Sequence, residues 1–188
     1  YCNLNLKAKA DLYELQNFLP EDIKANGDVK LNVKANVNNY QLANMDFTKA
    51  KIDGNLQWND MDVVYCDTIN VKADELMVNF TLPNAASEQL SNGLVNVAIS
   101  GNNLDAKVSE MIVANLKDYN INAQISNILD ENIPMSVYAD YSFSKIEASM
   151  EDMAFFTNNP QGSIAMFMKE DNKDASYIAV YNGDSLSF

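Results

Sequence analysis

Apolar and polar residues alternate along most of the chain. In residues 27–37, GDVKLNVKANV, every second residue from Val29 to Val37 is apolar, and the residues between them are Asp, Lys or Asn. Successive side chains of a β-strand point to opposite faces, so this stretch predicts a strand with one apolar and one polar face. The apolar row could line the interior of a closed β-sandwich or a surface that carries an apolar ligand. Residue chemistry alone leaves both interpretations open.

The same period of two recurs to the end of the chain. Further alternating segments are residues 2–10, 50–58, 61–65, 69–73, 76–82, 95–99, 104–108, 119–125, 135–143 and 146–150. Residues 163–181 predict a closing hairpin around residues 170–174, and its strands are apolar on both parities, so we expect both of their faces to be covered. This pattern predicts a mainly antiparallel all-β fold, either a curled sheet or a β-sandwich.

The apolar phase shifts by one residue inside several segments, near Asn59-Asp60, near Asp74-Glu75 and before Ile146. A one-residue slip reverses every side chain, so each shift predicts a β-bulge or a tight turn. Residues 84–93 are expected to form a loop. Turns are expected from their Gly, Asn and Pro residues at 26–27, 101–103 and 158–162.

Residues 11–20, DLYELQNFLP, depart from the period of two. Asp11 and Glu14 have the capping-box spacing, and Pro20 ends the segment. One helical face would carry Leu12, Leu15, Phe18 and Leu19. The sequence therefore predicts one short amphipathic helix near the N-terminus.

The charge balance excludes one broad class of function. The 188 residues suit a single β-rich domain over positions 1–188, with 13 basic residues, all lysine, against 26 acidic ones and a net charge of -13. A nucleic-acid-binding protein needs a positive face and generally uses arginine, so no nucleic-acid partner is expected. The negative charge would also be repelled by an anionic membrane surface.

Catalysis and metal binding are disfavoured by the residues that are missing. The chain has no histidine, no phosphate-binding glycine motif and no nucleophile elbow, so we expect no enzyme activity and no cofactor. Cys2 and Cys66 are too few for a zinc site; they are either one disulfide or two small buried hydrophobic residues. The acidic stretches 59–62 and 169–174 lack a calcium-loop pattern and are interpreted as solvated turns. A glycosidase with two carboxylates is a distant alternative.

Six aromatic residues could line a sugar platform or a lipid groove, or could simply be cross-strand core: Trp58, Tyr65, Phe80, Tyr138, Tyr141 and Phe143. No segment approaches the roughly 20 apolar residues of a membrane span. The chain opens directly on a strand pattern without a leader, so we interpret it as a fragment of a longer protein whose anchor lies elsewhere.

Residues 11–37 and 45–80 carry a family resemblance. They combine a short leucine-rich segment ending near Pro, a Gly that opens a strand, a K-x-x-G-x-L strand, and Asp and Val before the next strand. The combination resembles the AsmA-type repeat of the AsmA/TamB superfamily, and the lysine-only, asparagine-rich composition resembles its Bacteroidetes members. Matching positions are Leu12, Leu15, Phe18, Pro20, Gly27, Val29, Leu31, Ile52, Gly54, Leu56 and Val63.

The resemblance implies a function without catalysis. Members are anchored in the inner membrane, extend a β-rich body through the periplasm, and are linked to outer-membrane assembly; they are similar to bridge-like lipid-transfer proteins. It implies phospholipid acyl chains and other sections of the parent chain as partners. The candidate lipid-facing row is Val29, Leu31, Val33, Ile52, Leu56 and Trp58. The alternative is a β-sandwich binding or scaffold module that engages a glycan or a protein.

Overall fold

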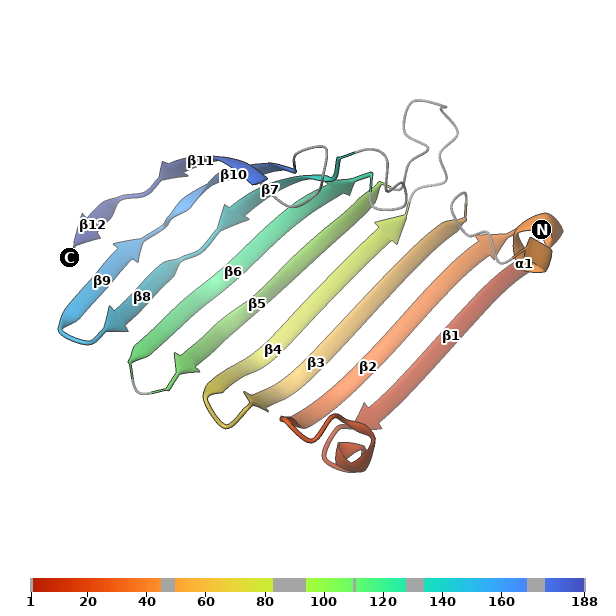
Figure 1. Ribbon diagram of the computed structural model, residues 1–188, viewed down its shortest axis with the longest axis horizontal. Helices are drawn as coiled ribbons and strands as arrows, with labels where there is room; N and C mark the ends of the chain where they lie inside the picture. The colour runs from red at the N-terminus through yellow and green to blue at the C-terminus, as the bar shows by residue number, and fades with distance from the viewer. Residues whose placement is uncertain are drawn as a thin grey trace.

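The computed structural model describes residues 2–44, 50–82, 94–109, 111–127, 134–168 and 175–187. These residues form one curled antiparallel sheet of 12 strands (Figure 1). The strands are β1 (Cys2–Asp11), β2 (Ile23–Val37), β3 (Lys51–Tyr65), β4 (Ile69–Leu82), β5 (Val95–Val108), β6 (Ile112–Ser126), β7 (Ser136–Ser142), β8 (Lys145–Met150), β9 (Met153–Asn158), β10 (Gln161–Met168), β11 (Ala175–Asn182) and β12 (Ser185–Ser187). The predicted all-β antiparallel class is confirmed.

Strands that are neighbours in the sequence are also neighbours in the sheet, and three long strands are interrupted near the middle. On the side away from β5, the first half of β6 pairs with β8 as far as Lys117 with Lys145. The second half pairs with β7 from Asn120 with Ser142 onward, and the register does not change between the two. The same continuity joins β9 to β10 and β11 to β12. The sheet is therefore a meander of nine long strands, with β1 at one edge and β11 and β12 at the other.

A line of bulges crosses the sheet at these interruptions. Asp60 in β3 and Asp118 in β6 have positive φ angles of 51° and 44°, and Asn159 between β9 and β10 has 45°. The pairing of β4 with β5 stops at Ala73 and resumes at Met77. The phase shifts expected near residues 59–60, 74–75 and 146 are thus confirmed as irregularities within long strands.

The turns expected from Gly, Asn and Pro residues are wrong, because the chain does not reverse at any of these positions. Strand β2 continues through Gly27, whose φ of 111° accompanies a register shift against β3, and β5 continues through residues 101–103. Residues 159–160 interrupt a strand without reversing it. Glycine and asparagine serve here as bulge residues, because both accept the left-handed conformation that a bulge can require. The expected loop at residues 84–93 lies outside the described residues.

The bulges keep the apolar side chains on one side of the sheet. Trp58 and Met61 in β3, like Leu116 and Tyr119 in β6, are three residues apart yet continue the same apolar row on either side of a bulge. We call the side that carries these rows the trough face and the opposite side the outer face. The one-residue phase shift in the sequence and the bulge in the backbone therefore cancel, and the apolar side chains stay on the same face along the whole strand.

The trough face is open. Among the described residues no second sheet covers it, which corrects the β-sandwich alternative, and the accessible surface of 12294 Å² exceeds the roughly 9,000 Å² expected for a compact monomer of this mass. The closing hairpin β10–β11 is confirmed by its pairing, but its expected double cover is wrong, because Ile178 and Tyr177 on opposite faces of β11 are 62% and 69% exposed. Its turn, residues 169–174, lies outside the described residues.

The predicted N-terminal helix is reduced to a 3₁₀ turn, Gln16–Phe18. Asp11 accepts a hydrogen bond from the Tyr13 amide at 2.9 Å instead of capping a helix, and Phe18 is exposed. The Gln16 side chain bonds the Ile23 carbonyl and the Ala25 amide, which fixes the turn against β2. A ten-residue segment is too short to form a stable helix without a packed apolar face, so these local bonds prevail. A short helix that the pattern did not predict, α1 (Asn39–Asn44), follows β2.

Candidate functional site

The six candidate residues lie together on the trough face of β2 and β3. Val29 pairs with Trp58, and Leu31 pairs with Leu56. Val33 lies opposite Gly54, and Ile52 lies opposite Ala35, on the same face. The side chains are partly exposed, as expected for one layer of sheet with no cover. The sequence therefore placed these six residues correctly on one surface.

This surface continues across the whole sheet. A ladder is here a row of paired residues, one from each strand that it crosses. One ladder consists of Leu6, Val33, Gly54, Phe80, Val97, Ala123, Ala139, Ile164 and Ala179. The next runs Ala8, Leu31, Leu56, Val78, Ile99, Ile121, Tyr141, Gly162 and Tyr181. Neither ladder contains a charged residue. At about 4.8 Å between strands, each offers an uncharged path of roughly 38 Å from edge to edge.

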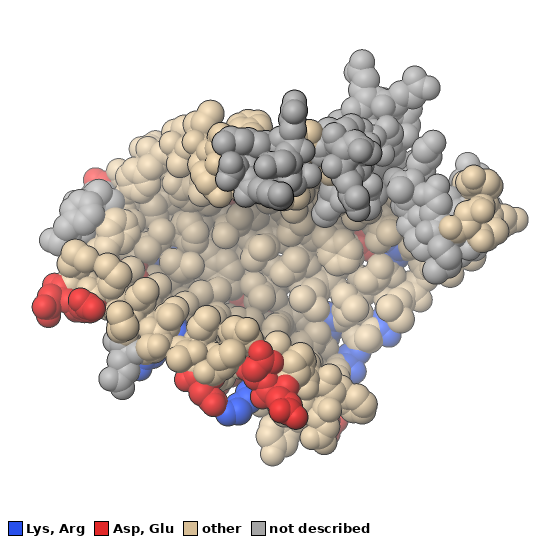
Figure 2. All heavy atoms as spheres, viewed as in Figure 1, with Lys and Arg blue, Asp and Glu red and all other residues tan. Residues whose placement is uncertain are grey.

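The hollow shape of this face is visible in the space-filling view. Figure 2 shows a surface hollowed along its middle, with uncharged side chains at its centre and acidic side chains gathered mainly at the ends of the strands. The charged residues within the strands alternate with the apolar ones and therefore point to the outer face. The curl of the sheet thus makes a trough lined by apolar side chains.

Glycines allow aromatic rings to lie along the floor of the trough. A Cβ built on Gly54 would clash with the ring of Phe80, its partner on β4. Gly101 faces Tyr119 in the same way on β5 and β6, and Gly162 faces Tyr141 on β10 and β7. These pairs were not predicted from the sequence, although a glycine at a position where the alternation calls for an apolar side chain was a signal for them. Each ring covers the neighbouring glycine rather than standing out of the sheet.

The tyrosines of the trough turn their hydroxyl groups toward protein partners. Tyr119 donates to the Glu75 carbonyl at 3.1 Å, and Tyr141 donates to the Val180 carbonyl at 3.2 Å. Burial, followed by the charges of Glu75 and Asp74, raises the pKa of Tyr119 above its ordinary value, so this residue remains a neutral donor. The trough therefore presents aromatic carbon, with these polar atoms already bonded.

Trp58, the one tryptophan of the chain, belongs to the same floor. Its Nε1 donates to the Asn26 carbonyl at 3.0 Å, beside the bulge at Gly27. Of the other aromatic candidates, Phe80, Tyr65 and Tyr141 also lie on the trough face, and Phe143 contacts Tyr141 at the bulge line with ring centroids 5.8 Å apart. The remaining candidate, Tyr138, points to the outer face.

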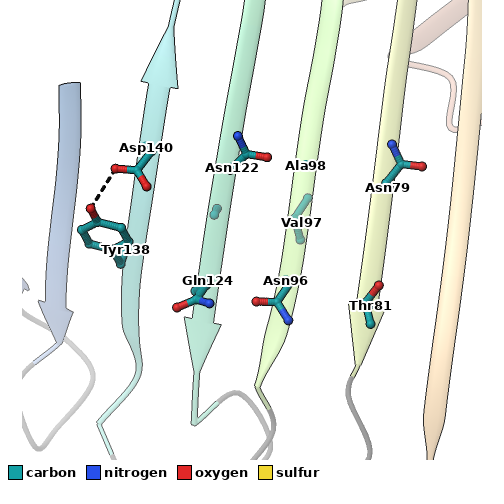
Figure 3. Close-up of a pocket in the computed structure, with 10 residues that line it drawn as sticks. Asn79, Thr81, Asn96, Val97, Ala98, Asn122, Gln124, Tyr138 and Asp140 are labelled. Carbon is teal, nitrogen blue, oxygen red and sulfur yellow. Dashed lines mark hydrogen bonds between the residues drawn. The ribbon is translucent and has the colours of Figure 1, made fainter. Parts of the chain in front are cut away.

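The outer face carries a shallow pocket of amide and hydroxyl groups. Figure 3 shows Asn79, Asn96 and Asn122 with neighbouring polar side chains on the outer face of β4 to β7. Asp140 accepts hydrogen bonds from Ser163 at 2.6 Å and Tyr138 at 2.8 Å. These two bonds, that of Ser163 first, hold the pKa of Asp140 below its ordinary value. A lowered pKa makes the Asp140 carboxylate a weaker base than an ordinary aspartate.

The acidic and cysteine candidates do not assemble into a site. Among the described residues, no group of three potential ligands is close enough to hold a metal ion. Asp62 pairs with Lys72 at 3.0 Å, whereas Asp60 occupies the bulge. Cys2 and Cys66 are both free, and Cys66 is exposed in the β3–β4 turn, so neither the disulfide nor a pair of buried thiols is formed. The acidic stretch 169–174 lies outside the described residues.

Comparison with protein-family models, with curated proteins and with solved structures finds no match to this chain. Within the described residues, no helix has the length and apolar character needed to cross a lipid bilayer.

Proposed function

We propose that this chain is a non-enzymatic, lipid-binding section of an AsmA-like protein, in which the trough face holds phospholipid acyl chains. One observation carries the proposal: an uncharged apolar surface runs unbroken across nine strands and is open to solvent. Soluble monomers rarely expose contiguous apolar patches of more than a few hundred Å² unless the patch binds something.

Acyl chains suit this surface better than a compact apolar ligand does. Burying one methylene group yields about 0.8 kcal/mol, and an extended trough distributes that gain along the length of the chain. A lipid can then shift along the ladders at little cost, because each position offers equivalent aliphatic and aromatic contacts. Movement of lipid along the trough needs no catalytic residue.

The cellular setting follows from the resemblance in residues 11–37 and 45–80. In this proposal the chain belongs to a periplasmic protein anchored in the inner membrane, and it contributes one section of a longer lipid path that serves outer-membrane assembly. Other sections of the same parent protein are its partners. The sheet edges at β1 and β11, which no other described strand covers, are compatible with such neighbours, since an edge strand presents unpaired backbone groups.

The proposal is tested by native mass spectrometry of the protein purified from bacterial membranes under mild conditions, followed by solvent extraction and lipid analysis. We expect protein–phospholipid adducts, because the trough would otherwise expose its apolar surface to water. A protein that is folded by circular dichroism and yields only the lipid-free mass, also after incubation with phospholipid vesicles, would contradict the proposal.

A further inference from the structure

A group of lysines lies on the outer face beside the open edge of the sheet. Lys9 of β1 is directly opposite Lys30 of β2, and Lys7 lies opposite Asn32. Like charges in directly opposed positions destabilise a sheet. The arrangement is unexpected in a chain with twice as many acidic as basic residues.

These lysines make no ion pair with any described residue. Within the described part of the chain, ion pairs are made by Lys24, Lys51, Lys72 and Lys145, and the other six described lysines make none, Lys7, Lys9 and Lys30 among them. The next register pair on this face is Asp11 with Asp28, and an Asp11 carboxylate oxygen is already bonded to the Tyr13 amide. The ammonium groups of the three lysines therefore remain available to an external anion.

A hollow of about 440 Å³ lies between them. It is lined by Lys7, Lys9, Lys30, Asn32 and Asn55, together with Ala8 and Leu31. Ala8 and Leu31 belong to the trough-face ladders, so the hollow combines cationic groups with atoms of trough residues at the edge of the sheet.

The edge strand connects this hollow to the trough. Leu4 and Leu6 of β1 are 46% and 58% exposed on the trough face, and Lys7 and Lys9 follow on the outer face of the same strand. Because β1 has no neighbour on its far side among the described residues, a ligand can pass around it from one face to the other. Lysine side chains can extend along apolar surface to bring their charge to such an edge.

We propose that Lys7, Lys9 and Lys30 bind the phosphate of an anionic lipid headgroup while the acyl chains of the same lipid lie across Leu4 and Leu6 in the trough. The inference rests on the proposed function and specifies its substrate class. A zwitterionic headgroup brings a positively charged amine, quaternary in phosphatidylcholine, close to the lysines, which repel it. A headgroup with net negative charge avoids this repulsion and neutralises the opposed Lys9 and Lys30.

The test uses Trp58 as an internal probe of the trough. Phospholipids with a dibrominated acyl chain quench tryptophan on contact, and they are presented as a small fraction of phosphatidylcholine vesicles, either as brominated phosphatidylglycerol or as brominated phosphatidylcholine. We expect stronger quenching by the phosphatidylglycerol. In Lys7→Gln/Lys9→Gln its apparent affinity should fall roughly 25-fold, since each of the two lysines near an anionic lipid contributes about a factor of five.

The matched control is Lys107→Gln/Lys117→Gln, which removes the same charge from the outer face of β5 and β6. It should keep the preference for phosphatidylglycerol. Equal quenching by the two lipids, or equal losses in both double variants, would overturn the headgroup site and leave the trough intact. Absence of quenching by either lipid would instead contradict the proposed function, and the headgroup site with it. Loss of quenching on addition of inorganic phosphate alone would show a site for free phosphate rather than for lipid.

Discussion

Replacing Gly54 with valine is expected to destabilise the sheet by about 1–3 kcal/mol, the usual cost of forcing extra carbon into filled space. A Cβ at this position would clash with the ring of Phe80 on the neighbouring strand. Valine is otherwise favoured in strands, so a loss of stability here would isolate the steric effect. The measurement is urea unfolding followed by far-UV circular dichroism.

Two further variants make the Gly54 result specific. Ala98→Val adds similar bulk to the outer face of β5, where the side chain meets solvent, and should change stability little. Phe80→Ala removes the ring, so Gly54→Val should cost much less in that background than in the wild type. Equal costs of Gly54→Val with and without the Phe80 ring would contradict the account of the trough floor.

The second large effect concerns bound lipid. Leu31→Asp/Leu56→Asp places two carboxylates side by side on the trough floor, because these residues are register partners. Covering an ionised carboxylate with an acyl chain removes its hydration without compensation, so we expect co-purified phospholipid to fall at least about tenfold. Lipid is measured by extraction and native mass spectrometry of the purified variants.

The control for added charge is Asn79→Asp/Asn122→Asp, which introduces the same two carboxylates on the exposed outer face. It should retain the lipid content of the wild type. If the trough double variant unfolds, Leu6→Asp provides the same comparison at a position that is 58% exposed and contributes little to packing. Undiminished lipid in folded Leu6→Asp, together with loss in the outer-face control, would contradict the assignment of the two faces.

Alternation along the sequence was sufficient to predict the strands and their two faces. Val29 to Val37 fell on one side as expected, and the phase shifts at Asn59-Asp60 and Asp74-Glu75 located real irregularities in the ladder. These features are local, because the parity of a side chain depends only on its own strand. The six candidate residues of the trough share one face for the same reason, and their contact with lipid stays a prediction.

Features that depend on distant partners were not predictable in this way. Residues 11–20 satisfied helix rules, but Gln16 finds its hydrogen-bond partners on β2, seven and nine residues ahead. The Gly101 and Asn159 regions matched turn signals, yet the strands continue because the register on both sides is maintained. Whether an apolar row is covered depends on a second layer, and strand periodicity contains no information about one.

The central claim is tested most directly by a photo-cross-linking scan along β6. Benzoylphenylalanine is introduced in turn at Asn120, Ile121 and Asn122, and the protein is irradiated in bacterial membranes and analysed for covalent phospholipid adducts by mass spectrometry. Ile121 points into the trough, whereas Asn120 and Asn122 point to the outer face, away from the lysines of β1 and β2. The account predicts adducts at position 121 and few or none at 120 and 122. Equal adducts at all three positions, or none at position 121 in a folded variant, would contradict it.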